Sequence, residues 1–136
     1  MSKEALQMEY PYGPGINHIE FWVKNLEETV RFYSELFPLI GWRALNQTSF
    51  SSGQQEIYFK EMPIALHESL GVRHICFHAI SPEVVDAVGA WLHRQNADII
   101  RGPLEMSHYS AGYYTVDFRD PNGFVLEVAH TPNARL

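Results

Sequence analysis

The chain has 136 residues, 46% of them hydrophobic and 13% aromatic, so we expect a single domain over residues 1–136 with a sizeable core. Its formal net charge is −6 and its 10 Lys and Arg residues are scattered, which argues against a nucleic-acid partner. Because the sequence has no apolar run near the ~20 residues of a membrane span, no signal-peptide core at residues 1–12 and only one cysteine, Cys76, we expect a cytoplasmic protein that does not bind membranes.

The first predicted element is a strand over residues 16–24, where apolar and other side chains alternate as in a strand with one buried face. The apolar face holds Ile19, Phe21 and Val23, and the other face holds His18, Glu20 and Trp22. A helix follows: Asn25 with Glu28 three residues later forms a capping-box-like start, and Pro38 ends the helix. Three short strands complete this half, at residues 42–45, 48–51 and 56–62.

The second half repeats the first. His74-Ile75-Cys76-Phe77 repeats His18-Ile19-Glu20-Phe21, and Ser81-Pro82 starts a helix at the offset that Asn25 has in the first copy. The predicted strands of this half cover 72–79, 97–104 (ending near Pro103), 112–119 and 124–129, with a turn at 120–123. Each half is thus strand, helix and three strands, with module one at about 16–62, a linker at 63–71 and module two at about 72–130.

The two repeated histidines share a face with a late glutamate. On the last strand the apolar side chains Phe124, Leu126 and Val128 share one face, so Glu127 points to the same side as His18 and His74. A lone strand histidine is more often structural than a ligand, but two at matched positions with a carboxylate in phase favour a divalent-metal site.

These segments together resemble the glyoxalase, bleomycin-resistance and extradiol-dioxygenase superfamily, also called the vicinal oxygen chelate superfamily. The resemblance covers about residues 16–130 and is carried by His18 to Val23, Asn25-Leu26-Glu27, Phe32-Tyr33, Gly41-Trp42, His74 to Phe77 and Asp120 to Glu127. It implies an α+β fold in which two tandem βαβββ modules form a cupped mixed sheet around one divalent metal ion (zinc, nickel, manganese or iron). It also implies that His18, His74 and Glu127 hold the metal, that the substrate is a small molecule and that the chain forms a homodimer.

Glyoxalase-like members add a Glu or Gln ligand from the fourth strand, where Glu56 and Tyr58 are the candidates because Ile57 and Phe59 take the core face. Glu56 is the better ligand chemically, or a general base, since a carboxylate is ionised near neutral pH and a phenol is not. Two alternatives stay open: Glu56 is simply solvated, or Tyr58 holds the ligand position.

Extradiol dioxygenases place a catalytic His and Tyr ahead of the closing Glu. His108 has a compatible spacing but is equally consistent with an ordinary loop histidine. Asp117 stands in the Tyr position, where it could orient substrate or water, or pair with Arg119 or with a neighbouring strand. Aromatic side chains could line the cleft or fill the core: Trp22, Trp42, Tyr58 and Tyr113. We therefore expect a metal-dependent lyase or isomerase; the alternatives are an Fe(II) dioxygenase and a metal-free protein that binds an aromatic or drug-like compound.

Overall fold

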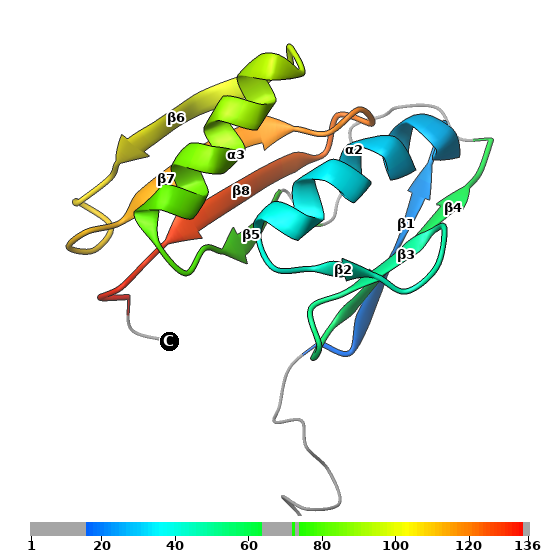
Figure 1. Cartoon of the computed structure of the whole chain (residues 1–136), viewed down its shortest axis with the longest axis horizontal. Helices are drawn as coiled ribbons and strands as arrows, with labels where there is room; N and C mark the ends of the chain where they lie inside the picture. The colour runs from blue at the N-terminus through cyan, green and yellow to red at the C-terminus, as the bar shows by residue number, and fades with distance from the viewer. Residues whose placement is uncertain (1–15, 64–71, 73, 135–136) are drawn as a thin grey trace, which may run out of the picture.

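The computed structural model describes residues 16–63, 72 and 74–134, so residues 1–15 and most of the predicted linker lie outside it (Figure 1). The first half contains β1 (His18–Val23), α2 (Leu26–Leu39), β2 (Arg43–Ala44), β3 (Ser49–Ser51) and β4 (Glu56–Glu61). The second half contains β5 (His74–His78), α3 (Pro82–Arg94), β6 (Ile99–Glu105), β7 (Tyr114–Arg119) and β8 (Val125–His130).

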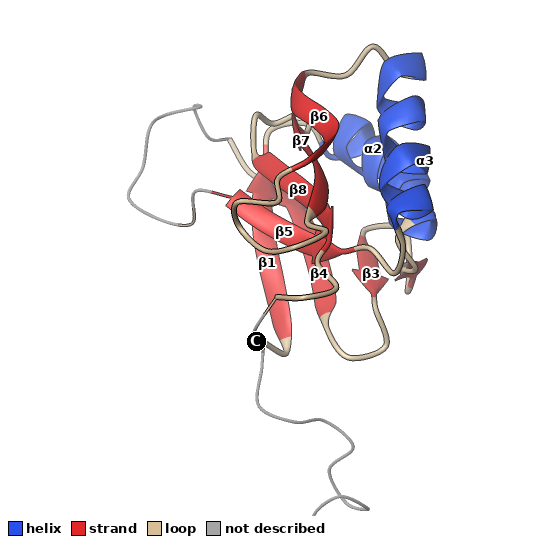
Figure 2. Ribbon diagram, turned by 90° about the vertical axis from the view of Figure 1, so that its left-hand side faces the viewer, coloured by secondary structure: helices blue, strands red, loops and turns tan. Residues whose placement is uncertain are grey.

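Each half forms its own four-stranded sheet, with the matching orders β1-β4-β3-β2 and β5-β8-β7-β6. The outer pairs β1–β4 and β5–β8 are parallel and the remaining pairs are antiparallel, so both sheets are mixed. Figure 2 shows both helices on the same side of the strands, which leaves the other side of the sheets without a helix. The prediction of an α+β fold made of two tandem βαβββ modules is confirmed.

The helices begin at the two predicted caps. The Asn25 side chain accepts a hydrogen bond from the backbone N–H of Glu28 at 3.0 Å, and the Ser81 hydroxyl accepts one from Val84 at 3.4 Å. Such side-chain acceptors satisfy backbone donors that have no partner inside the helix. Helix α2 ends one residue after Pro38, the predicted end. Among the described residues, no helix is both long and apolar enough to cross a membrane.

The core lies between the helices and the sheets, as the alternation of side chains predicts. Val23, Ile57 and Phe59 are at most 4% exposed, whereas His18 and Trp22 on the alternate positions are exposed. The Trp42 ring stacks on Phe37 with centroids 5.1 Å apart, so Trp42 packs against this core.

A buried turn of the second half ties the two halves together. The Tyr33 hydroxyl of α2 donates to the Asp120 carboxylate at 2.7 Å, and the Asn122 side chain donates to the Thr29 hydroxyl at 3.0 Å. Burial raises the pKa of Asp120, and burial together with Asp120 raises that of Tyr33. The turn therefore connects the two halves through buried polar contacts, and it also leads the chain into β8.

The strand predicted over residues 97–104 is present as β6 (Ile99–Glu105) and ends one residue later than predicted. Its pairing with β7 is irregular, with register shifts between Ile99 and Arg101 and again between Arg101 and Leu104. Gly102 has a φ of +93°, and a Cβ on it would overlap the carbonyl oxygen of Thr115. A glycine is thus required where β6 approaches β7 most closely.

Candidate metal and substrate site

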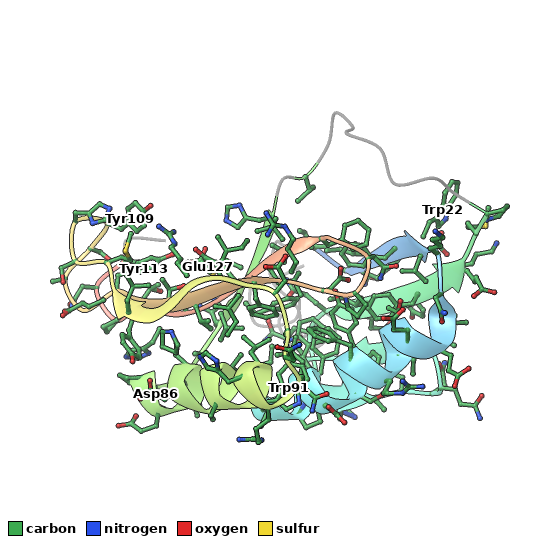
Figure 3. All side chains as sticks on the ribbon, turned by 90° about the horizontal axis from the view of Figure 1, so that it is seen from above. Trp22, Asp86, Trp91, Tyr109, Tyr113 and Glu127 are labelled. Atoms are coloured by element: carbon green, nitrogen blue, oxygen red, sulfur yellow. The ribbon has the colours of Figure 1, made fainter. Side chains whose placement is uncertain are left out.

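Glu127 is the organising residue of the candidate site. It lies in the middle of β8, is only 5% exposed, and belongs to the face of the sheet opposite the helices (Figure 3). The hydroxyls of Tyr113 and Thr115 both donate to its Oε2, at 2.6 and 2.7 Å. Two donors on the same oxygen fix the orientation of the carboxylate and leave Oε1 to face a different partner.

That partner is His74, whose Nε2 lies 3.5 Å from Oε1 of Glu127. This distance is longer than that of an ordinary N–H···O hydrogen bond, so the imidazole nitrogen and the carboxylate oxygen lie close together without forming one. The parallel pairing of β5 with β8 creates this arrangement, because it sets Cys76 opposite Glu127 and brings the neighbouring His74 alongside.

The thiol of Cys76 lies beside the Glu127 carboxylate. Although Cys76 is an exposed residue, desolvation of its thiol and the neighbouring Glu127 carboxylate raise the pKa of Cys76 to about 12. Without a bound metal ion the sulfur is therefore a protonated thiol near neutral pH.

A pocket of about 540 Å³ opens beside the His74–Glu127 pair. Its lining includes Arg101, Tyr109, Tyr113 and Asp117 as well as that pair. Of the two predicted ways of pairing Asp117, the one with a neighbouring strand is observed: Asp117 forms an ion pair with Arg101 of β6. Arg119 pairs with Asp98 instead, at 3.0 Å. The volume is in the range of small-molecule sites, and the lining combines aromatic rings with charged groups.

The first half carries a matching but separate cluster on the same helix-free side. The rings of His18 and Tyr58 meet edge to face with centroids 5.6 Å apart, and the Tyr58 hydroxyl donates to Glu56. The hydrogen bond to Glu56 is the main reason why the pKa of Tyr58 is raised. The register of β1 on β4 sets Glu56 directly opposite His18.

The structure does not unite the two clusters within one chain. Among the described residues, no three His, Cys, Asp or Glu side chains come close enough to hold a metal ion. His74 and Glu127 therefore lie together on the second sheet, and His18 lies with Glu56 on the first. Trp22 is 51% exposed at the far end of the helix-free side, where its indole N–H donates to Glu20 at 3.1 Å (Figure 3).

His108 lies in the turn after β6, with its ring 4.3 Å from that of Tyr109, and it does not line the pocket. Five residues at the site are absent from the predicted set: Ile100, Arg101, Tyr109, Thr115 and Val125. Thr115 could have been found from its position in phase with Glu127, and Gly102-Pro103 within a strand pattern is the signal for the irregularity that places Arg101.

Two βαβββ modules, each with a strand histidine and a carboxylate on the helix-free face, define an α+β class of proteins that build small-molecule sites from paired modules. The chain belongs to the Glyoxalase/Bleomycin resistance protein/Dioxygenase superfamily, whose model matches residues 15–128.

Three similar proteins illustrate the range of this superfamily. The metallothiol transferase FosB of Shouchella clausii is 32% identical over 132 residues, covering 86% of this chain and 80% of the relative. The virulence protein STM3117 of Salmonella typhimurium is 26% identical over 123 residues, covering 84% and 82%. The solved structure of a glyoxalase/bleomycin resistance protein from Albidiferax ferrireducens superimposes with a TM-score of 0.69 at 22% identity, covering 86% and 98%, and supports the fold.

Proposed function

We propose that the protein is a divalent-metal enzyme of the lyase or isomerase type that acts on a small molecule with two neighbouring oxygen atoms, with His18, His74 and Glu127 as the metal ligands. The observation that carries this proposal is the pair formed by His74 and the buried Glu127, whose carboxylate is oriented by two hydroxyls.

The donor set fits a divalent ion. An imidazole and a carboxylate suit zinc, nickel, manganese and iron alike, and the hydroxyls of Tyr113 and Thr115 supply the outer hydrogen bonds that metal-binding carboxylates usually have. When bound, such an ion would serve as a Lewis acid toward the oxygen atoms of the substrate. The buried Glu127 and the partly exposed His74 form the side of the pocket beside which those oxygens would lie.

The third ligand is proposed to come from a second copy of the chain. His18 lies with Glu56 on the first sheet, apart from the His74–Glu127 pair, and no described group of three ligands forms within one chain. A homodimer in which the helix-free side of one chain's first sheet faces the second sheet of its partner would complete two equivalent sites.

Glu56 is the proposed fourth ligand or general base. Its carboxylate accepts a hydrogen bond from Tyr58, which parallels the bond from Tyr113 to Glu127 in the other half. In both halves a tyrosine thus orients a glutamate, and this parallel favours Glu56 over Tyr58 as the metal-facing group. A carboxylate in that position can also accept a proton from substrate.

A second candidate is the transfer of a thiol to a small electrophile, which the 32% identity to a metallothiol transferase supports. The dioxygenase alternative has less support, because His108 does not line the pocket and Asp117 is paired with Arg101. Incubation of the zinc- or manganese-loaded protein with a 2-oxoaldehyde hemithioacetal, or with an epoxide and a thiol, separates the two leading activities by product.

Metal binding is the decisive test of the proposal. His74→Ala and Glu127→Gln should each weaken the affinity for Zn²⁺ or Mn²⁺ in calorimetric titration by more than tenfold, by loss of one ligand. His78→Ala is the matched control, because His78 is exposed on the same strand and face as His74. A metal-free binding protein would show no tight metal binding in any form, and equal affinity in all variants would overturn the ligand assignment.

A further inference from the structure

We propose that Arg101 binds an anionic group of the substrate, so that the pocket accepts a small carboxylate whose other end lies toward His74 and Glu127. This inference rests on the proposed function, because it assigns the far end of the same substrate. Four features of the second module support it.

The first feature is the irregularity of β6. Ile100 and Arg101 are consecutive, and side chains of consecutive strand residues normally point to opposite faces, yet both line the pocket. The register shift between Ile99 and Arg101 explains this, since a bulge turns a side chain toward the other face. Such bulges are over-represented beside active sites, where they aim side chains that a regular strand would misplace.

The second feature is that neighbouring backbone and side chains hold this irregular segment firmly. Gly102 packs so closely on Thr115 that a Cβ has no room, and a Cβ on Gly89 of α3 would overlap the Pro103 ring. The segment after Arg101 is therefore fixed on both faces, against β7 and against the helix. A guanidinium on such a support is held in place before a ligand arrives.

The third feature is the ion pair between Asp117 and the guanidinium of Arg101. The Asp117 carboxylate accepts a hydrogen bond from Nε of Arg101, and the Tyr109 side chain also hydrogen-bonds the guanidinium. The remaining N–H groups of the guanidinium are then the donors for a ligand in the pocket. The Arg101 side chain is 39% exposed and that of Asp117 only 11%, so the arginine forms the accessible part of the pair. The carboxylate anchors the cation, and the planar end of the guanidinium matches a second carboxylate in two-point geometry.

The fourth feature is the charge of the pocket. Arg101 is its only permanently charged cation among the lining residues that the structure describes, and the rings of Tyr109 and Tyr113 flank the same space. Their centroids lie 5.2 Å apart at an angle of 68°, which gives the pocket an aromatic wall. A small carboxylate with an unsaturated or aromatic body fits both parts of this lining.

The competing explanation is that Arg101 only neutralises the buried Asp117. Binding of a matched probe pair separates the two, with benzoate as the anion and benzamide as its neutral analogue, titrated into the full chain by calorimetry. The double variant Arg101→Gln/Asp117→Asn replaces the ion pair by a neutral pair without leaving a buried charge alone. It should weaken benzoate binding about ten- to a hundredfold and leave benzamide binding unchanged, because hydrogen bonds to charged groups are the stronger ones.

Asp117→Asn alone should strengthen benzoate binding several-fold, because it frees the positive charge of Arg101, whereas a merely neutralising arginine predicts no selective gain for the anion. Arg119→Gln is the control: Arg119 forms an exposed ion pair with Asp98 outside the pocket, so its loss should leave both probes unaffected. Equal losses for benzoate and benzamide, or unchanged benzoate binding in the double variant, would overturn the inference.

The titrations are run with and without Zn²⁺, which keeps this inference distinguishable from the proposed function. If the Arg101 variant weakens benzoate binding while substitutions of His74 and Glu127 leave Zn²⁺ affinity unchanged, the anion site is supported and the metal site is refuted. If substitutions of His74 and Glu127 weaken Zn²⁺ binding while the Arg101 variant binds benzoate normally, the metal site is supported and the anion site is refuted.

Discussion

Thr115 donates its hydroxyl to Oε2 of Glu127 at 2.7 Å and also reaches the backbone carbonyl of Val128 at 3.2 Å. The two residues lie on neighbouring antiparallel strands, and Thr115 is completely buried. A single hydroxyl thus connects the proposed metal ligand to the ladder that carries it. The carboxylate is consequently positioned both by the sheet, through Thr115, and by Tyr113, the residue just before β7.

Removal of that hydroxyl should weaken metal binding. Thr115→Val keeps the shape of the side chain but deletes the donor, and loss of such outer partners typically reduces metal affinity about 10- to 100-fold. Zn²⁺ or Mn²⁺ titration of the purified variant measures the effect. Thr115→Ser retains the hydroxyl and is the control; equal metal affinity in Thr115→Val and wild type would contradict the orienting role.

Mixed dimers should recover metal binding that neither parent variant shows. If each site takes His18 from one chain and His74 from the other, a dimer of a His18→Ala chain with a His74→Ala chain has one intact site and one without either histidine. Refolding an equal mixture should therefore restore metal binding to part of the sites, measured by metal analysis after gel filtration. No recovery on mixing would show that the site does not form between two chains.

Gly102→Ala should be much more disruptive than Gly53→Ala. Both glycines have positive φ, +93° and +96°, so alanine should cost each about 1–2 kcal/mol of conformational energy. A Cβ at Gly53 meets nothing within 4 Å, whereas one at Gly102 overlaps the Thr115 carbonyl. We expect urea unfolding to show the larger loss for Gly102→Ala, with weaker metal binding as well; similar losses for both variants would exclude the close approach.

Tyr33→Phe should change the alkaline stability of the protein. At neutral pH the variant should lose about 1–3 kcal/mol, because the buried Asp120 loses a donor. Burial and Asp120 raise the folded-state pKa of Tyr33 above the unfolded value near 10. The folded protein then holds a proton that the unfolded chain has released, so the stability due to Tyr33 is present below about pH 10 and falls as the pH rises further.

Urea unfolding of wild type and Tyr33→Phe from neutral pH to above pH 10 tests this expectation. The advantage of the wild type over the variant should shrink with rising pH, because only the wild type has this buried phenol to ionise. Tyr109→Phe, at a ring that is 55% exposed, controls for the removal of a hydroxyl at the surface. A constant difference across the range would refute the assignment.

Asn122→Ala should destabilise the contact between the two halves. The Asn122 side chain donates to Thr29 at 3.0 Å and accepts from the backbone N–H of Lys24 at 3.3 Å, both of which belong to the first half. Losing these partners in a buried turn should cost about 1–3 kcal/mol of unfolding free energy. Asn133→Ala removes one exposed hydrogen bond to Ala111 and should cost clearly less in the same denaturation experiment.

The architecture could be predicted because it depends on local rules. The caps at Asn25 and Ser81 follow from side chains that satisfy backbone donors, and the burial of Ile57 and Phe59 follows from strict two-residue alternation. The same alternation placed Glu127 on the helix-free face with His74. Where the chain follows a regular period, the sequence therefore determines which side chains can meet.

The remaining details depend on contacts between segments far apart in the chain. The pairing of Asp117 with Arg101 follows from the bulge in β6, whose extra residue a simple alternation rule does not anticipate. Likewise, the phase of Tyr113 predicts its face, but only the folded sheet shows its hydroxyl on Glu127. The predicted ligand role of His18 stays a prediction, because it depends on how a second chain docks.

The close packing of Gly102 on Thr115 has a consequence for how such a protein can diversify. One backbone contact lies between the strand that carries Arg101, the proposed anion-binding residue, and Thr115, whose hydroxyl orients the proposed metal ligand Glu127. Natural variants with altered selectivity should therefore retain the path of the main chain here and differ at side chains such as Tyr109 and Ile100, which line the pocket without taking part in that contact. Laboratory evolution aimed at new substrates should accordingly randomise those two positions first.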